Sequence, residues 1–180
     1  MKDYRFLIAV AGTVYILDQV TKFIVRSNIA LGDIWSPWPW LTRYARIAHI
    51  KNTGAAFGML PSFSDVITII SILVIIAILY YFPRLPHDQW LLRLALGLQM
   101  GGALGNLTDR LRQGYVTDFI SVWRFPVFNI ADASISIGVA ILIISMWFQE
   151  QDKQPSEPSP PAELTSEAGS SHLPEDVPGE

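Results

Sequence analysis

Long apolar stretches alternate with mixed polar segments along the chain. Four stretches are long enough to cross a bilayer, which takes roughly 20 helical residues. They are residues 6–24, 63–82, 90–108 and 130–148. Pro83 and Pro86 end the second and most uniformly apolar stretch, because a proline ring cannot continue a helix. The pattern therefore predicts an all-α polytopic membrane protein with four transmembrane helices.

The first apolar stretch has two interpretations. Lys2 and Arg5 precede a short uninterrupted apolar run, as they would in a cleaved signal peptide. However, Asp18 and Lys22 interrupt the expected exit, and no small-residue cleavage site follows promptly. Asp18 and Lys22 are four residues apart, so on a helix they form a self-neutralising ion pair that makes insertion tolerable. We therefore expect a retained helix.

The segments between the apolar stretches predict a small sheet. Residues 44–51 alternate imperfectly between apolar and polar side chains, which is typical of a short strand. The connection over residues 109–129 has a similar mixed character, and we expect the two to pair. Trp35, Trp38 and Trp40 are spaced by prolines and are typical of an aromatic belt at the water–lipid boundary.

Charge divides the chain into two parts. Of all residues, 51% are hydrophobic and 16% are charged, which is low for a soluble domain. Before residue 150, 12 Lys and Arg outnumber 8 acidic residues, all of them Asp, which suits contact with anionic lipid headgroups. Residues 150–180 are rich in Pro, Ser and Glu, and cannot bury enough surface to fold. We predict a four-helix membrane domain over residues 1–149 and a disordered acidic tail over residues 150–180.

Composition excludes several kinds of chemistry. The chain has no cysteine, which rules out disulfides, thiolate metal sites and a cysteine nucleophile. The three histidines are scattered without metal-ligand spacing, so we expect neither a metal site nor a cofactor. No phosphate-binding glycine loop is present, and no basic run with aromatics indicates nucleic acid. A Ser–Lys dyad stays open, but no serine stands in a polar cluster as rich as those around the aspartates.

Asp118 and Asp132 stand fourteen positions apart beside membrane-length apolar stretches. A carboxylate at the centre of a membrane helix costs about 2.5 to 3.5 kcal/mol on insertion scales, so it is seldom without function. If the two meet at one end of neighbouring helices, they share a proton and provide acid–base chemistry. Asn129 and Asp132 also fit an N-cap and first-turn acid of the fourth helix, and this interpretation is compatible with catalysis.

A polar cluster also closes the third apolar stretch. Asn106 and Arg110 are four residues apart and share one helix face, with Asp109 beside them. Gly101 and Gly105 have the small-xxx-small spacing of closely packed membrane helices. Packing explains the glycines, but it does not explain Asn, Asp and Arg within five residues.

Five ordered runs resemble the signature boxes of lipoprotein signal peptidase, the bacterial signal peptidase II, over about residues 4–148. They are Asp18-Gln-x-x-Lys22, Asn52-Thr-Gly-Ala-Ala-Phe57, Gly101-Gly-Ala-Leu-Gly-Asn-x-x-Asp-Arg110, Gly114-x-Val-x-Asp-Phe119 and Phe128-Asn-x-Ala-Asp132. Each box alone is weak, but five in order are specific. The resemblance implies a membrane aspartyl endopeptidase that removes the signal peptide from diacylglyceryl-modified prolipoproteins, cleaving before the lipidated cysteine.

The resemblance also implies roles for single residues. Asp118 and Asp132 match the catalytic pair. The supporting or substrate-binding positions are Asp18, Lys22, Asn52, Gly54, Gly102, Asn106, Arg110 and Asn129. The implied partners are lipid-modified prolipoproteins, membrane lipids and a globomycin-type inhibitor, and we expect a monomer. No role is implied for the tail.

The resemblance further implies a location in the bacterial inner membrane. Both termini are then cytoplasmic, and the site with its β element lies near the extracytoplasmic surface. The positive-inside rule alone favours the reverse, because five Lys and Arg fall on the side of the termini and eight on the other. We interpret several of those eight as serving the site and not the topology, so the resemblance decides the orientation.

Two other classes of function stay open at this point. In a small channel or carrier, Asp18, Lys22, Asp118 and Asp132 would line a polar path and carry solute without proteolysis. In a non-catalytic membrane scaffold, the aspartates would be exchangeable for asparagine without loss of function.

Overall fold

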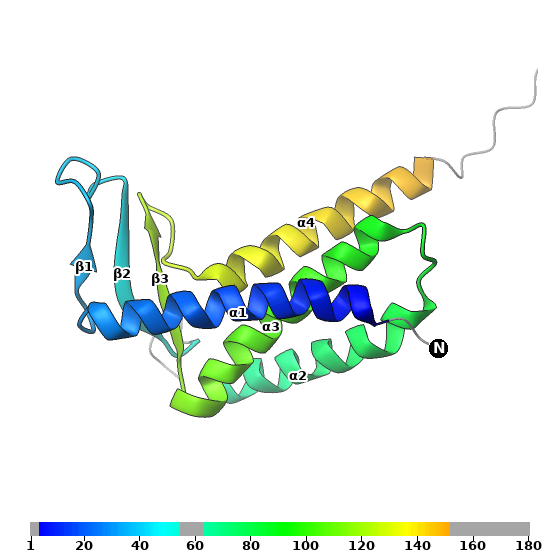
Figure 1. Ribbon diagram of the computed structural model, residues 1–180, viewed down its shortest axis with the longest axis horizontal. Coiled ribbons are helices and arrows are strands. Elements are labelled where there is room, and N and C mark those ends of the chain that lie inside the picture. The colour runs from blue at the N-terminus through cyan, green and yellow to red at the C-terminus, as the bar shows by residue number, and fades with distance from the viewer. Residues whose placement is uncertain (1–3, 55–62, 152–180) are drawn as a thin grey trace, which may run out of the picture.

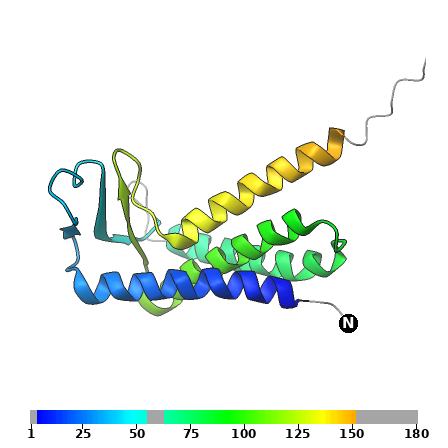
Figure 2. The ribbon, with the colours of Figure 1, turned by 45° about the horizontal axis from the view of Figure 1, so that its top comes forward.

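The computed structural model describes residues 4–54 and 63–151. Its elements are α1 (Arg5–Asn28), β1 (Ile34–Trp35), β2 (Ala45–Asn52), α2 (Phe63–Tyr81), the 3-10 helix η1 (Phe82–Arg84), α3 (Trp90–Gln113), β3 (Val116–Val122) and α4 (Ile130–Gln151). The long helices α1, α2, α3 and α4 form a bundle, and β1, β2 and β3 stand together at one end of it (Figure 1). The start of α1 and the end of α4 lie at the opposite end (Figure 2).

Lipid is the natural solvent of this bundle. Among the described residues, three helical stretches are long and apolar enough to cross a membrane: Arg5–Asn28, Ser64–Arg84 and Ile130–Phe148. Their apolar side chains point outward; on α2, for example, Ile69, Leu73 and Ile76 are 58%, 59% and 56% exposed. So large an apolar surface is unfavourable in water. The prediction of a mostly helical membrane protein with a small sheet is therefore confirmed.

Helix α3 is not among these three stretches. Its buried positions include the polar residues Arg93, Asn106 and Asp109, which lower its hydropathy. It contacts α1, α2 and α4, and it lies among them in the bundle (Figure 1). A helix surrounded by protein needs less lipid-compatible surface than one that faces hydrocarbon. Its passage across the membrane, and so the count of four spans, stays a prediction.

Glycines on α3 allow its neighbours to approach closely. A Cβ added at Gly105 would lie 2.5 Å from Oδ2 of Asp18 on α1. A Cβ added at Gly102 would lie 2.5 Å from the carbonyl oxygen of Ala131 on α4. Gly101 likewise packs against Val14 of α1. The packing role predicted from the glycine spacing is therefore confirmed, on two different faces of the helix.

The sheet is antiparallel, with strand order β1-β2-β3. The predicted pairing of the two mixed segments is confirmed, with Ile50 opposite Asp118 and Asn52 opposite Val116. The register shifts between Ile47 and Ile50, where β2 has one more residue than β3. The two-residue strand β1 was not predicted, because so short an element leaves no periodic pattern.

Some predictions concern regions that the structure does not test. Trp35, Trp38 and Trp40 are exposed, at 55%, 55% and 68%, but their place at a membrane surface stays a prediction. Residues 152–180 of the tail and residues 55–57 of the second signature box lie outside the described residues. The fourth helix continues to Gln151, beyond its predicted end.

Candidate active site

Asp118 lies on β3 and is 2% exposed. Its Oδ2 accepts a hydrogen bond from Nδ2 of Asn52 at 2.8 Å, and its Oδ1 accepts one from Nδ2 of Asn129 at 2.7 Å. Asn52 reaches it diagonally across the sheet, since Asn52 pairs with Val116, two residues before Asp118. Strand pairing therefore supplies one amide donor, and the start of α4 supplies the other.

Asp132 lies in the first turn of α4. Its Oδ2 accepts a hydrogen bond from the backbone N–H of Asn129 at 3.2 Å, while its own N–H donates to Oδ1 of Asn129 at 2.9 Å. This reciprocal pair is a capping box, so the predicted N-cap is confirmed. Its Oδ1 accepts a further bond, at 2.7 Å, from Nδ2 of Asn106 on α3. The Asp132 side chain is thus held in place by donors from α3 and from the start of α4 itself.

Asn129 brings the two carboxylates together. Its side chain donates to Asp118 and its backbone donates to Asp132. Burial raises the pKa of Asp118 to about 6 against the hydrogen bond from Asn52, and the negative charge of Asp132 raises it further. The aspartates expected to converge do so, at the junction of β3 and α4. Such a pair can exchange a proton with water and with a substrate carbonyl.

The orientation of the asparagine amides follows from their other contacts. Oδ1 of Asn52 accepts the N–H of Gly54 at 2.8 Å, and Oδ1 of Asn129 accepts the N–H of Asp132 at 2.9 Å. A backbone N–H can only donate, so it fixes the amide oxygen and leaves the NH2 group for the carboxylate. Gly54 has a φ of +79°, a left-handed conformation that favours glycine.

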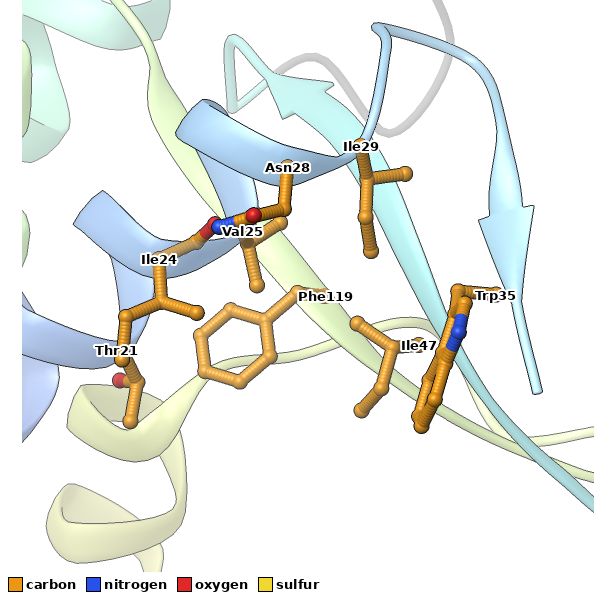
Figure 3. A pocket seen from close by; sticks show the side chains of 8 residues that line it. All are labelled: Thr21, Ile24, Val25, Asn28, Ile29, Trp35, Ile47 and Phe119. Atoms are coloured by element: carbon orange, nitrogen blue, oxygen red, sulfur yellow. The ribbon is translucent and has the colours of Figure 1, made fainter. Parts of the chain in front are cut away.

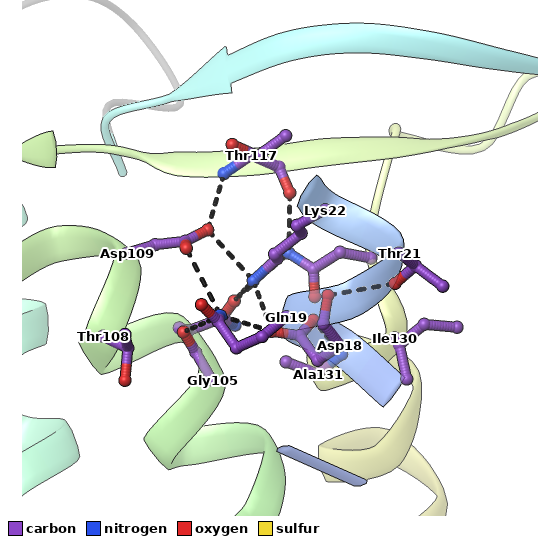
Figure 4. Close-up of polar contacts among 12 residues, drawn as sticks. Asp18, Gln19, Thr21, Lys22, Gly105, Thr108, Asp109, Thr117, Ile130 and Ala131 are labelled. Carbon is purple, nitrogen blue, oxygen red and sulfur yellow. Dashed lines mark hydrogen bonds and ion pairs between the residues drawn. The ribbon is translucent and has the colours of Figure 1, made fainter. Parts of the chain in front are cut away.

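A second polar cluster joins α1 to α3, β3 and the start of α4 (Figure 4). At its centre Lys22, fully buried on α1, has its Nζ 2.8 Å from Oδ2 of Asp18 and 3.1 Å from Oδ2 of Asp109. The predicted ion pair of Asp18 and Lys22 is therefore confirmed. Oδ1 of Asp18 also accepts the N–H of Ala131 at 3.0 Å, which ties α1 to the first turn of α4. Nζ of Lys22 donates to Oδ1 of Asn106 at 2.9 Å, so the two clusters are joined.

Asp109 is a residue that the sequence-based site did not include. It is 1% exposed and accepts the N–H of Thr117 at 3.1 Å. Its other oxygen lies 3.4 Å from Nη1 of Arg26, which also donates to Oγ1 of Thr117 at 3.2 Å. Its position in the sequence could have indicated a role in the site, because it is an acidic residue one turn from Asn106 at the end of a mostly apolar helix.

Arg110 completes the set of predicted residues. Its charge interacts with those of Asp132, Asp118 and Asp109, and its Nε is buried without a hydrogen-bond partner among the described residues. The supporting residues thus gather around the aspartates from α1, β2, α3 and the start of α4. Their roles in a reaction stay predictions. Within the described part of the chain, no group of three or more His, Cys, Asp or Glu is placed to hold a metal ion.

An apolar pocket of about 550 Å³ lies between the end of α1 and the sheet (Figure 3). Its lining residues are Thr21, Ile24, Val25, Asn28, Ile29, Trp35, Ile47 and Phe119. Phe119 follows Asp118 on β3, and successive strand residues point to opposite faces of a sheet. Phe119 therefore faces the pocket from the side of β3 opposite to Asp118.

Comparison with known sequences agrees with this geometry. A family model described as "Signal peptidase (SPase) II" matches residues 10–148, which include all the predicted site residues. The chain belongs to the signal peptidase II family. This membership makes it a peptidase and, together with its apolar helices, a membrane protein.

Signal peptidase II relatives match most of the chain. The lipoprotein signal peptidase of Moorella thermoacetica is 41% identical over 141 residues, covering 77% of this chain and 92% of that protein. The lipoprotein signal peptidase of Bacillus velezensis is 40% identical over 149 residues, covering 81% and 95%. A solved structure described as a bacterial membrane enzyme superposes with a TM-score of 0.74 at 36% identity, covering 84% of this chain and 93% of the other.

Proposed function

We propose that this signal peptidase II family member is an aspartyl endopeptidase of diacylglyceryl-modified prolipoproteins. It removes the signal peptide by cleaving before the lipidated cysteine. One observation carries this proposal. The buried carboxylate of Asp118 and the half-buried carboxylate of Asp132 both accept hydrogen bonds from Asn129, the first from its side chain and the second from its backbone N–H. The relatives named lipoprotein signal peptidase support the choice of substrate.

The mechanism uses one proton shared between the two carboxyl groups, because two like charges in contact do not both stay ionised. The ionised aspartate takes a proton from a water molecule, and the oxygen of that water attacks the scissile carbonyl carbon. The protonated aspartate hydrogen-bonds the carbonyl oxygen. The C–N bond then breaks, and the leaving amine takes up the proton that the aspartate removed from water, so the pair again holds one proton. Since water is the nucleophile, no covalent acyl-enzyme accumulates.

The proposed orientation places the site at the outer surface of the bacterial inner membrane. In this arrangement α3 is the fourth span, and its 24 residues would reach about 36 Å at roughly 1.5 Å per residue. Both termini are cytoplasmic, supported by the position of the α1 start and the α4 end away from the sheet (Figure 1). The peptidase domain comprises residues 1–149, α4 continues to Gln151, and the acidic segment that follows is cytoplasmic.

We further propose how the protein meets its partners. It acts as a monomer surrounded by membrane lipids. The exposed Trp38 and Trp40 stack on each other with ring centroids 6.0 Å apart, and their loop covers the bound signal peptide. A globomycin-type inhibitor competes with the prolipoprotein.

The proposal is tested with the purified chain in lipid vesicles and a diacylglyceryl-modified prolipoprotein as substrate. Asp118→Asn and Asp132→Asn should each lower the cleavage rate by roughly 10² to 10⁴-fold, because each removes one acid–base group. The matched control is Asp33→Asn, an exposed aspartate at the same end of the molecule, which should cleave like the wild type. Globomycin should inhibit the wild-type protein.

Two outcomes would contradict the proposal. Near-normal cleavage by either aspartate variant would show that the two aspartates are not the catalytic pair. Solute flux through the vesicles without any proteolysis would instead favour the channel or carrier hypothesis.

A further inference from the structure

Lys22 makes more contacts than neutralising its charge requires. It is 0% exposed, and its ammonium group already lies 2.8 Å from Asp18 and 3.1 Å from Asp109. Two carboxylates are enough to compensate one buried ammonium. The third donor of the group is nevertheless directed at a neutral side chain, the carbonyl oxygen of Asn106, at 2.9 Å.

The contact with Asn106 determines which way its amide faces. An ammonium group has three donors and no acceptor, so only the amide oxygen can face it. Nδ2 of Asn106 then points to the other side, where it donates to Oδ1 of Asp132 at 2.7 Å. A flipped amide would set an NH2 group against the ammonium and a carbonyl oxygen against the carboxylate, and each unmade bond to a charged group is costly.

The remaining contact of Asn106 is weaker. Nδ2 of Asn129 also reaches Oδ1 of Asn106, at 3.2 Å, but the same Nδ2 lies 2.7 Å from Asp118. A charged donor makes a stronger hydrogen bond than a neutral one, and that of Lys22 is also the shorter of the two. The orientation of Asn106 therefore depends mainly on Lys22.

We propose that Lys22 is a positioning residue that acts on Asp132 through Asn106. Its ammonium group occupies the amide oxygen and so holds the NH2 group of Asn106 on the carboxylate of Asp132. This inference rests on the proposed proteolytic function of the aspartate pair. It assigns to Lys22 a role in the reaction that is separate from its ion pair with Asp18.

The chain offers a matched control for this role. Arg26 lies one turn after Lys22 on α1 and also contacts Asp109, with Nη1 3.4 Å from Oδ1. Its hydrogen bonds go to Asp109 and Thr117 and not to Asn106. Arg26→Met thus removes a cation from the same cluster without releasing the amide, and should keep kcat within about three-fold of the wild type.

The test variant is Asp18→Asn/Lys22→Met, measured in the full-length chain in vesicles with the diacylglyceryl-modified prolipoprotein. The double exchange removes one charge of each sign, so no uncompensated ion is left in the core, and Asp109 retains Arg26. We expect kcat to fall by about 100-fold, as for a displaced catalytic group, with KM within about two-fold.

A double-mutant cycle with Asn106→Ala separates positioning from general stability. If Lys22 acts through Asn106, adding Asp18→Asn/Lys22→Met to Asn106→Ala should lower kcat by less than about three-fold more. Independent, multiplying losses would overturn the inference, and so would an unchanged kcat in the test variant. If the test variant does not fold, Lys22→Arg decides, because arginine is also a pure donor. Folded Lys22→Arg should retain at least about a tenth of kcat, and inactivity equal to that of Asn106→Ala would overturn the inference.

A pH profile gives a second readout. Asp118 is influenced electrostatically by Asp132 of α4, Lys22 of α1 and Arg110 of α3. Burial is the main cause that raises the pKa of Asp118, and the charge of Lys22 acts against it. Loss of Lys22 should therefore shift to higher pH the part of the pH–rate profile that reports the titration of Asp118. Arg26→Met should leave that part of the profile in place. An unmoved profile on loss of Lys22 would count against the inference. Absence of cleavage by the wild-type chain would instead overturn the proposed function itself.

Discussion

At the scale of single residues, neutral amides define the geometry around the two carboxylates. Asn52, Asn106 and Asn129 come from β2, α3 and the residue preceding α4, and each donates its NH2 group to an aspartate. In each case another donor holds the amide oxygen, so the side chain has a single favourable orientation. Among the described residues, Asp118 and Asp132 therefore accept hydrogen bonds from amide and backbone N–H groups and not from a charged donor.

Asp118 should carry a measurable cost in stability. Its folded-state pKa is raised by burial from 3.8 to about 6, so the folded protein binds this proton more tightly than the unfolded chain does. The contribution of this group to stability is therefore fully present below pH 4 and is lost as the pH rises through 6. Asp118→Asn has no charge to bury. At pH 7.5 it should be more stable than the wild type by about 1 to 3 kcal/mol, although inactive.

Thermal unfolding in detergent micelles between pH 4 and pH 8 measures this difference. The advantage of Asp118→Asn should shrink as the pH falls and vanish near pH 4. The control is Asp33→Asn, which removes an exposed carboxylate in place of a buried one. A variant that is less stable than the wild type at pH 7.5 would show that the ionised carboxylate is held more favourably than its burial implies.

At the scale of elements, the position of α3 determines how well the site is assembled. Gly105 brings it against Asp18 of α1, and Gly102 brings it against Ala131 of α4. Asn106 follows directly after Gly105, so the same close contacts carry it to Lys22 and to Asp132. Helix packing and active-site geometry therefore depend on the same turn of one helix.

Gly102→Ala tests this dependence. Its Cβ would lie 2.5 Å from a backbone oxygen and 2.7 Å from Cγ1 of Ile135, and a backbone atom cannot rotate away. We expect a loss of about 1 to 3 kcal/mol in stability, typical of overpacking, together with a fall in kcat. The control is Gly12→Ala on α1, where an added Cβ meets nothing within 4 Å. Unfolding temperature and cleavage rate measure both variants, and equal behaviour of the two would contradict the packing argument.

The sequence predicts the elements better than their contacts. Apolar length and the prolines at 83 and 86 predicted the helices to within a few residues. Imperfect alternation predicted β2, and the mixed character of residues 109–129 predicted that a partner strand lies there. The convergence of Asp118 and Asp132 followed from their positions beside apolar stretches. What the sequence could not show is which neighbour each polar group selects. Asp109 was visible as a charge in the third helix, but only the approach of α1 reveals that it shares Lys22 with Asp18.

At the scale of the whole molecule, the fold separates the two aspartates from the end of α4. Asp118 lies on β3 and Asp132 in the first turn of α4, and the last turn of α4 lies at the end of the bundle away from the sheet (Figure 2). A chain that ends after Gln151 should therefore cleave the prolipoprotein at the wild-type rate. Cleavage assays on the full-length and shortened chains, with equal amounts inserted in vesicles, make the comparison. A large loss of activity would show that the acidic tail takes part in the reaction or in substrate delivery.

Helix α4 has a consequence for anyone who wishes to handle this protein. Asp132 lies in its first turn and Gln151 at its end, so roughly 28 Å of continuous helix, at about 1.5 Å per residue, separates Asp132 from any label joined there. A fluorophore or an immobilising resin attached at that end stays clear of the entering lipopeptide. The length of the same helix also provides a reference distance for energy-transfer measurements between a label at its end and a labelled substrate.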